Sequence, residues 1–184
     1  NNTRSTHIMK ASSPGLTTSW CSIGSFGFEF KITSNNPLVC SQLSLNRLRQ
    51  ELENSVAHLL SKLDMHHEAK NLISDNLYIY IKDPKGIYIG CNDKLANDIG
   101  FNSGINIIDQ SDHDLTWSQE AQQLILNDQQ VLQHHQELLV NEHCAMPDGN
   151  INTFLSQKKP LTFAGDAFNS LIGISINTKN IISS

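Results

Sequence analysis

The sequence predicts an α+β fold in which a five-stranded antiparallel sheet carries helices on one face and follows a long amino-terminal helix. Leucines at helical spacing run through residues 38–73, and two alternating strand patterns with a turn between them follow. A helical middle segment then leads to three more strand patterns near the carboxyl end. Strands grouped before and after helices in this way are typical of α+β domains.

Residues 1–37 are predicted to be a flexible tail with one short strand. The first 19 residues are rich in Ser, Thr and Asn and show no apolar period. Further on, Phe26, Phe28, Phe30 and Ile32 alternate with other residues, which is the period of a strand. An Asn-Asn-Pro run ends this pattern.

Residues 38–73 are predicted to form one long amphipathic helix of the coiled-coil type. Its apolar stripe consists of Leu45, Leu48, Leu52, Val56, Leu59 and Leu63. Such a helix is about 50 Å long, and one small domain cannot cover its whole length. We therefore expect a homodimer paired through this helix. The alternative is a single helix that folds back on its own domain and breaks near Asp64.

The segment 74–178 is predicted to be the main folded domain, with residues 179–184 as a short tail. The expected elements are strands at 77–82, 87–91, 137–145, 151–161 and 170–176, a short helix between Asn92 and Gly100, irregular structure at 101–117, and a longer helix from Ser118. A turn at 83–86 joins the first two strands, because its Asp-Pro-Lys-Gly run suits a β-turn.

Composition excludes several classes of partner. The chain has 184 residues with a net charge of −5 and no basic patch, so we expect no nucleic-acid contact by this segment. No apolar run approaches the roughly 20 residues of a membrane span, so no membrane contact is expected. The sequence shows no signal peptide, and its four cysteines are scattered, which favours reduced thiols and a cytoplasmic location.

Several runs within 74–178 agree in order and spacing with one known family. They are Tyr78–Asp93 (YIYIKDPKGIYIGCND), Ile107–Trp117 (IIDQSDHDLTW), Asp148-Gly149, Phe154–Leu161 and Leu171–Ile176. Together they resemble the PAS domains of bacterial signal-transduction sensors. The sequence departs from the family pattern at Asp109, at Thr116 and in the closing run 176–178.

The resemblance implies a sensory module without a catalytic step. Such domains hold a small ligand between the sheet and the helices and pass the signal through dimer helices to an output domain. That output would be a histidine kinase or a transcriptional regulator outside this chain. The side chains expected to line the pocket are Leu95, Ile99, Ile108, Trp117, Leu124, Ile125, Asp128, Leu132 and Ser156. A pocket filled by its own side chains, in a purely dimerising PAS domain, is the alternative.

Asp128 is the most pointed of these candidates. It lies on the apolar stripe of the longer helix, three residues before Val131, so we expect it to be buried. A buried carboxylate needs partners, which would come from the 109–117 linker or from a polar ligand.

No cofactor, metal or catalytic residue is expected. An acidic run with a histidine, residues 109–114, suits turns and helix caps better than a metal site. A small metal-binding enzyme that uses these Asp and His side chains remains an alternative. His134 and His135 suit a solvated helix end rather than haem, and the Asn-Cys-Arg-Phe run of flavin-binding PAS relatives is absent.

The strand at 77–82 is apolar on both faces. Leu77, Ile79 and Ile81 point one way, and Tyr78 and Tyr80 point the other. We expect the two tyrosines on the face away from the pocket, where the end of the long helix and a second chain would cover them.

Overall fold

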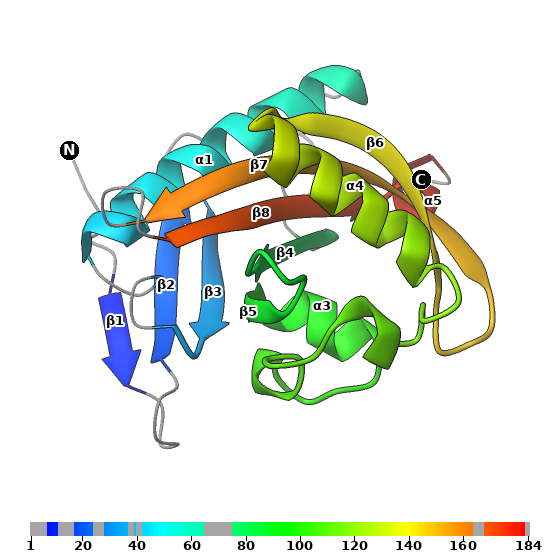
Figure 1. Cartoon of the computed structure of the whole chain (residues 1–184), viewed down its shortest axis with the longest axis horizontal. Helices are drawn as coiled ribbons and strands as arrows, with labels where there is room; N and C mark the ends of the chain where they lie inside the picture. Colours follow the sequence, from blue (N-terminus) through cyan, green and yellow to red (C-terminus); the bar gives the residue numbers. More distant parts are fainter. Residues whose placement is uncertain are drawn as a thin grey trace.

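The computed structural model describes residues 7–10, 17–23, 28–36, 39, 42–64, 75–163 and 168–182 (Figure 1). The amino-terminal elements are β1 (His7–Lys10), β2 (Thr17–Ile23), β3 (Phe28–Ser34) and α1 (Gln42–Lys62). The remaining elements are β4 (Leu77–Lys82), β5 (Tyr88–Asn92), α3 (Asp93–Asp98), α4 (Ala121–His134), β6 (Leu138–Ala145), β7 (Ile151–Phe163), β8 (Phe168–Asn177) and α5 (Thr178–Ile182). Two 3-10 helices, Gly104–Asn106 and Asp112–Asp114, lie between α3 and α4.

The strands form one antiparallel sheet with the order β1-β2-β3-β5-β4-β8-β7-β6. The predicted α+β class is confirmed, and β4 to β8 are the five strands that the sequence predicts. The sheet is larger than predicted because β1, β2 and β3 extend it beyond β5. Residues Ile32 to Ser34 of β3 pair with β5 and cover an edge that would otherwise expose unpaired backbone groups.

The prediction of a tail before the long helix was therefore wrong for β1 and β2. Their sequences, HIMK and TTSWCSI, are short and mostly polar, so they carry a weak strand pattern on their own. The predicted strand near Phe28 exists, although it begins and ends two residues later than expected. At the other end of the chain, α5 occupies part of the predicted tail.

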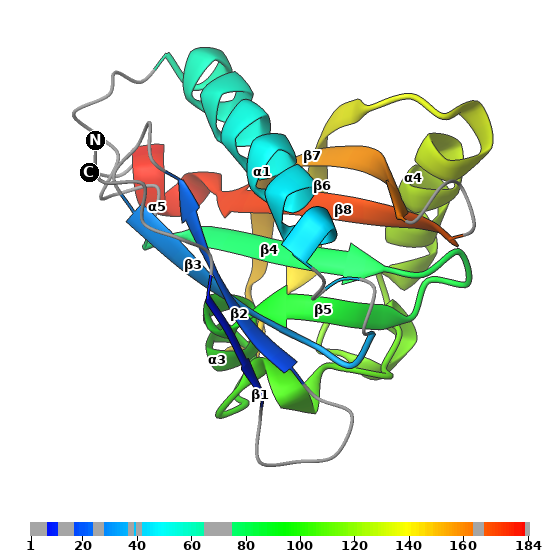
Figure 2. The ribbon, with the colours of Figure 1, turned by 90° about the vertical axis from the view of Figure 1, so that its left-hand side faces the viewer.

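The helix α1 packs against one face of the sheet, and α3 and α4 lie on the other (Figure 2). Four members of the predicted stripe, Leu48, Leu52, Val56 and Leu59, are fully buried within this single chain. They pack with isoleucines and leucines of β4, β7 and β8. At about 1.5–3 kcal/mol for each fully buried side chain, this contact is a major stabilising element of the fold.

The prediction that this stripe pairs two chains is contradicted by that burial, since the sheet of the same chain already covers it. The helix is also shorter than predicted. It ends at Lys62, and Asp64 adopts a left-handed backbone conformation with φ 53° that interrupts helical geometry. Leu63 is half-buried against the same core, whereas the side chain of Leu45 and the predicted contact region near Ile73 lie outside the described residues.

The two faces of β4 are also exchanged relative to the prediction. Leu77, Ile79 and Ile81 belong to the α1 side of the sheet, while Tyr78 and Tyr80 point toward α3 and α4. Both tyrosines are buried, so neither forms an exposed patch for a second chain. The alternation correctly separates the side chains of β4 into two faces. Both faces are apolar enough to be buried, so the pattern alone does not say which helix covers which face.

Local sequence signals explain the turn between β4 and β5 but not the start of α3. Asp83 caps the predicted turn by accepting hydrogen bonds from the backbone of Lys85 and Ile87, and Gly86 supplies its positive φ of 83°. Asn92 does not cap α3 with its side chain; its amide instead bonds the backbone of Leu77 and Ile79 in β4. None of the described helices is both long and apolar enough to span a bilayer.

Candidate ligand cavity

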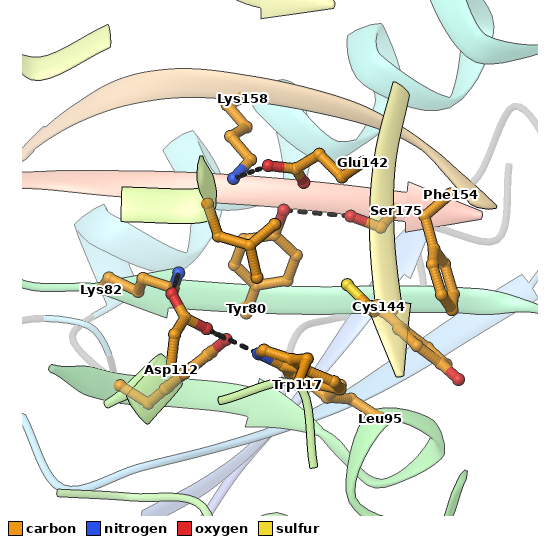
Figure 3. Close-up of a pocket in the computed structure, with 13 residues that line it drawn as sticks. Tyr80, Lys82, Leu95, Asp112, Trp117, Glu142, Cys144, Phe154, Lys158 and Ser175 are labelled. Carbon is orange, nitrogen blue, oxygen red and sulfur yellow. Dashed lines mark hydrogen bonds and ion pairs between the residues drawn. The ribbon is translucent and has the colours of Figure 1, made fainter. Parts of the chain in front are cut away.

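A small cavity lies between the inner face of the sheet and the segment that runs from α3 to α4 (Figure 3). Its lining residues are Tyr78, Tyr80, Lys82, Tyr88, Leu95, Asp112, Trp117, Leu124, Glu142, Cys144, Phe154, Lys158 and Ser175. The free space is about 30 Å³, which is room for one or two water molecules. Aromatic rings form much of the wall, and the Tyr78 and Phe154 rings lie 5.1 Å apart.

One half of the polar wall is built around Lys82, the last residue of β4. Its Nζ lies 2.6 Å from Asp112 Oδ2 and 2.7 Å from Asp128 Oδ2. The other oxygen of Asp112 accepts hydrogen bonds from Tyr88 at 2.6 Å and from the Trp117 indole at 2.9 Å. Asp112 is therefore held by donors from β4, β5 and the linker before α4.

The other half is built around Lys158 of β7. Its Nζ lies 2.6 Å from Asp128 Oδ1 and 2.6 Å from Glu142 Oε2. Asn127 also donates to that Glu142 oxygen at 3.0 Å. Asp128 thus bridges the two lysines, one through each of its oxygens, and ties α4 to both β4 and β7. All five charged side chains are at least nine-tenths buried.

We call Lys82, Lys158, Asp112, Asp128 and Glu142 the inner charge network. Two cations face three carboxylates, an excess of one negative charge. Aromatic faces support the cations, since Lys82 Nζ lies 4.8 Å from the Tyr88 ring centroid and Lys158 Nζ lies 5.9 Å from that of Tyr80. Paired charges of this kind exist in an interior only when their partners compensate the loss of water.

The contacts of the network stabilise the charged forms of Asp112, Lys82 and Lys158. Burial raises the pKa of Asp112, but the charge of Lys82 and the hydrogen bonds from Lys82, Tyr88 and Trp117 outweigh it, so this pKa is lowered from 3.8. Burial lowers the pKa of Lys82, but Asp128 and Asp112 outweigh it, so this pKa is raised. The pKa of Lys158 is raised in the same way by Tyr80, Asp128 and Glu142 against the effect of burial.

A hydroxyl chain runs along the sheet behind the network. The Tyr80 hydroxyl lies 3.0 Å from Ser175 Oγ, which lies 2.7 Å from Ser156 Oγ. Burial is the main cause that raises the pKa of Tyr80 to about 12. The Tyr80 ring lies over Gly173, its register partner on β8, and a Cβ at position 173 would overlap with the ring. Glycine is thus required where the tyrosine enters the cavity wall.

The thiols of Cys91 and Cys144 are buried and are not activated nucleophiles. Burial raises the pKa of Cys91 and of Cys144 to about 12, so both are protonated at neutral pH. Cys144 lines the cavity, whereas Cys91 donates to the carbonyl of Gly104 at 3.5 Å. Both thiols therefore act as small core groups.

The predicted pocket residues fall into three groups. Leu95, Trp117 and Leu124 line the cavity. Ile125, Asp128 and Leu132 line a second pocket of about 110 Å³ between α4 and the turn after β4, which also contains Lys82. Ile99, Ile108 and Ser156 are buried but line neither of these two pockets.

The predicted acidic run does not gather into one site. Asp109 is exposed and accepts from Asn35, Asp112 belongs to the inner charge network, and Asp114 caps the 3-10 helix by accepting from Ser111. Within the described ranges, His, Cys, Asp and Glu side chains form no group of three that would hold a metal ion. Asp128 is buried, and it reaches the linker only indirectly, through Lys82.

Sequence reasoning missed most of the polar wall. It did not select Lys82, Lys158 or Glu142, it considered Asp112 only for the alternative metal site, and it placed Tyr80 on the opposite face. One signal was present in the strands themselves. Lys82 continues the alternation of Tyr78 and Tyr80, and Lys158 continues that of Phe154 and Ser156, so each lysine shares a face with buried residues.

Comparison with known proteins gives a fold but no close relative. No family model matches the sequence, and no match was found among curated proteins. A structure of the Vibrio cholerae VqmA dimer in the absence of target DNA has a TM-score of 0.51 and 18% identity, over 54% of this chain and 45% of that one. VqmA bound to DPO gives the same TM-score and identity over 55% and 52%. The PAS domain of a Colwellia psychrerythraea protein has a TM-score of 0.47 and 17% identity, over 55% and 85%.

The element order from β4 to β8 is two strands, a helical segment and three strands, which is the order that the sequence motifs predict. The chain has a PAS fold, and the prediction from its sequence motifs is confirmed. At identities this low the likeness extends to the fold and not to the site. The match spans about half the length of the VqmA chains.

Proposed function

We propose that this chain is the sensory part of a cytoplasmic bacterial signal-transduction protein and that a small ligand binds in the cavity beside the inner charge network. The observation that carries the proposal is a buried polar wall around a cavity. A purely structural PAS core gains little from five buried charges, because apolar residues of the same volume stabilise an interior at least as well. Buried polar groups around free space are instead typical of ligand recognition.

A route for the signal is supported by two neighbouring residues of β7. Lys158 faces the cavity, while Lys159 faces the other side of the sheet and lies 3.4 Å from Glu51 of α1. A ligand that moves β7 would therefore change the support of α1. A packed element with two arrangements is a physical means of passing a signal to a histidine kinase or transcriptional regulator beyond these residues.

A homodimer remains part of the proposal, since VqmA is described as a dimer. Its interface is not the stripe of Leu48, Leu52, Val56 and Leu59, which the sheet of the same chain covers. Multi-angle light scattering at tens of micromolar tests the dimer, and a monomer at that concentration ends this part of the proposal.

Native mass spectrometry of the freshly purified protein tests ligand binding, with a compound screen by thermal shift and DPO as one named probe. Leu124→Trp fills the cavity, and Leu126→Trp is a matched control because Leu126 is 48% exposed on the same helix. We expect a bound compound, or a thermal shift, with wild type and Leu126→Trp but not with Leu124→Trp. Equal responses of the two variants, or no compound at all with wild type, would contradict a sensory cavity and favour a purely structural PAS domain.

A further inference from the structure

We infer that the cavity selects a small planar cation with several N–H donors, of the amidinium or protonated amino-heterocycle class. This inference rests on the proposed function and adds the chemical class of the ligand. Its starting point is the charge of the wall, where three buried carboxylates surround two buried lysines. One negative charge therefore has no counterion among the side chains of the network, and an unpaired buried charge is unfavourable.

Glu142 is the carboxylate of the network with an oxygen that receives no hydrogen bond from the described part of the chain. Its Oε2 receives both contacts made to this side chain, one from Lys158 Nζ at 2.6 Å and one from Asn127 at 3.0 Å. Its Oε1 has no hydrogen-bond partner in the described part of the chain, although Glu142 lines the cavity and is only 5% exposed. A ligand N–H in the cavity would satisfy this oxygen, and a positive ligand would also balance the excess charge.

Neither lysine is free to bind an anionic ligand, because both are already paired with carboxylates. Lys82 Nζ already lies within 2.7 Å of two carboxylates, and Lys158 Nζ lies within 2.6 Å of two. An anionic ligand would raise the excess to two negative charges in the same small volume. Like charges that close together in an interior repel strongly, so carboxylate ligands are disfavoured.

The rest of the wall suits a flat cation. Tyr78, Tyr80, Tyr88, Trp117 and Phe154 line the cavity, and the faces of aromatic rings attract cations. The free space of about 30 Å³ holds one or two heavy atoms without movement of the wall. A ligand of this class would therefore have to displace apolar lining side chains such as Leu124 and Cys144.

Two isosteric series test the class. Acetamidinium, acetamide and acetate share one shape and differ in charge, and benzamidinium, benzamide and benzoate repeat the series at a larger size. Binding is followed through the Trp117 indole N–H signal in NMR, assigned with Trp117→Phe, because this group bonds Asp112 at the cavity wall. We expect at least one amidinium to bind at least tenfold more tightly than its amide, and both carboxylates to cause no shift.

Glu142→Gln separates charge from shape, since the amide oxygen still accepts from Asn127. This variant should reduce the preference for amidinium over amide to less than threefold. Glu137→Gln, the same change at an acid with a side chain 59% exposed outside the cavity, should leave the preference intact. An amide or carboxylate that binds as tightly as its amidinium, or an unchanged preference in Glu142→Gln, overturns the inference but leaves the sensory function standing. If no compound binds, the inference also fails, and the native mass spectrum of wild type decides separately whether the sensory function survives.

Discussion

The two faces of the sheet are buried to a similar extent, but different chemistry fills them. On the α1 side, Leu52 and Val56 meet isoleucines such as Ile79, and this face needs only apolar volume. On the α4 side, the same strands present Lys82 and Lys158 to three buried carboxylates beside a cavity. Apolar contacts stabilise without regard to direction, whereas a charge network depends on each partner. The difference indicates that stability and recognition are assigned to opposite faces of one sheet.

Removal of a lysine should have the largest effect, because it leaves carboxylates without a cation. Lys158→Met keeps most of the volume but takes a direct partner from Asp128 and Glu142. We expect a loss of about 3–5 kcal/mol in the free energy of unfolding. Urea denaturation at pH 7 measures it, with Lys159→Met on the opposite face as the control, since Lys159 makes only looser, partly exposed pairs.

Truncation of a side chain on the α1 side should lower the free energy of unfolding by no more than the loss of a network cation does. The mechanism differs, because only packing is lost. Leu52→Ala leaves a cavity in a fully buried region, so we expect a loss of about 2–5 kcal/mol. This loss should be the same at pH 5 and pH 8, because the packing there carries no charge. A pH-dependent loss would show that the two faces are not separate.

Gly173→Ala should disturb the inner face without changing a charge. The added Cβ overlaps with the Tyr80 ring, so the ring must move and the contact with Ser175 is lost. Overpacking of this kind costs about 1–3 kcal/mol. Urea denaturation gives the loss, and Gly149→Ala is an unsuitable control because of its positive φ of 86°. Tyr80→Phe/Gly173→Ala, which removes the hydroxyl, should recover little if the ring itself is the obstacle.

Tyr80→Phe should have the smallest effect at neutral pH and a distinct signature at alkaline pH. Burial raises the pKa of Tyr80 from 10.0 to about 12, so the folded state holds this proton more tightly than the unfolded state. The resulting stability is complete below pH 10 and is lost as the pH rises toward 12. The variant should lose about 0.5–1.5 kcal/mol at pH 8 and show a shallower alkaline decline than wild type. Urea midpoints from pH 8 to 11 test this, and an identical decline would contradict it.

Much of the fold was accessible from the sequence because strand and helix periods are local. The strand β4 has its predicted limits, and the leucine stripe of α1 is an apolar face as predicted. The surface that covers the leucine stripe of α1 could not be predicted from nearby residues. The stripe is satisfied equally by a second chain or by the sheet of the same chain, and only the tertiary arrangement of β4 and β8 decides between them.

The site was less accessible because its contacts join distant segments. Lys82 is 30 residues from Asp112 and 46 from Asp128, and Lys158 is 30 residues from Asp128. A lysine at the end of a strand is usually solvated, so nothing in the neighbouring residues marks these two as buried. Asp128 was recognisable because a helix shows its buried face by period, which is a stronger signal than a strand of six residues gives.

A double-mutant cycle between Lys158 and Glu142 tests most directly that the charges of the inner charge network depend on one another. Urea unfolding at pH 7 gives the free energies of wild type, Lys158→Met, Glu142→Gln and the double variant. We expect Glu142→Gln to stay within about 1 kcal/mol of wild type, because the amide oxygen still accepts from Asn127 and Lys158 keeps its pair with Asp128. The double variant should recover at least about 2 kcal/mol of the loss seen in Lys158→Met, since the unpaired charge is gone. A double variant as unstable as the sum of the two single changes would contradict the account.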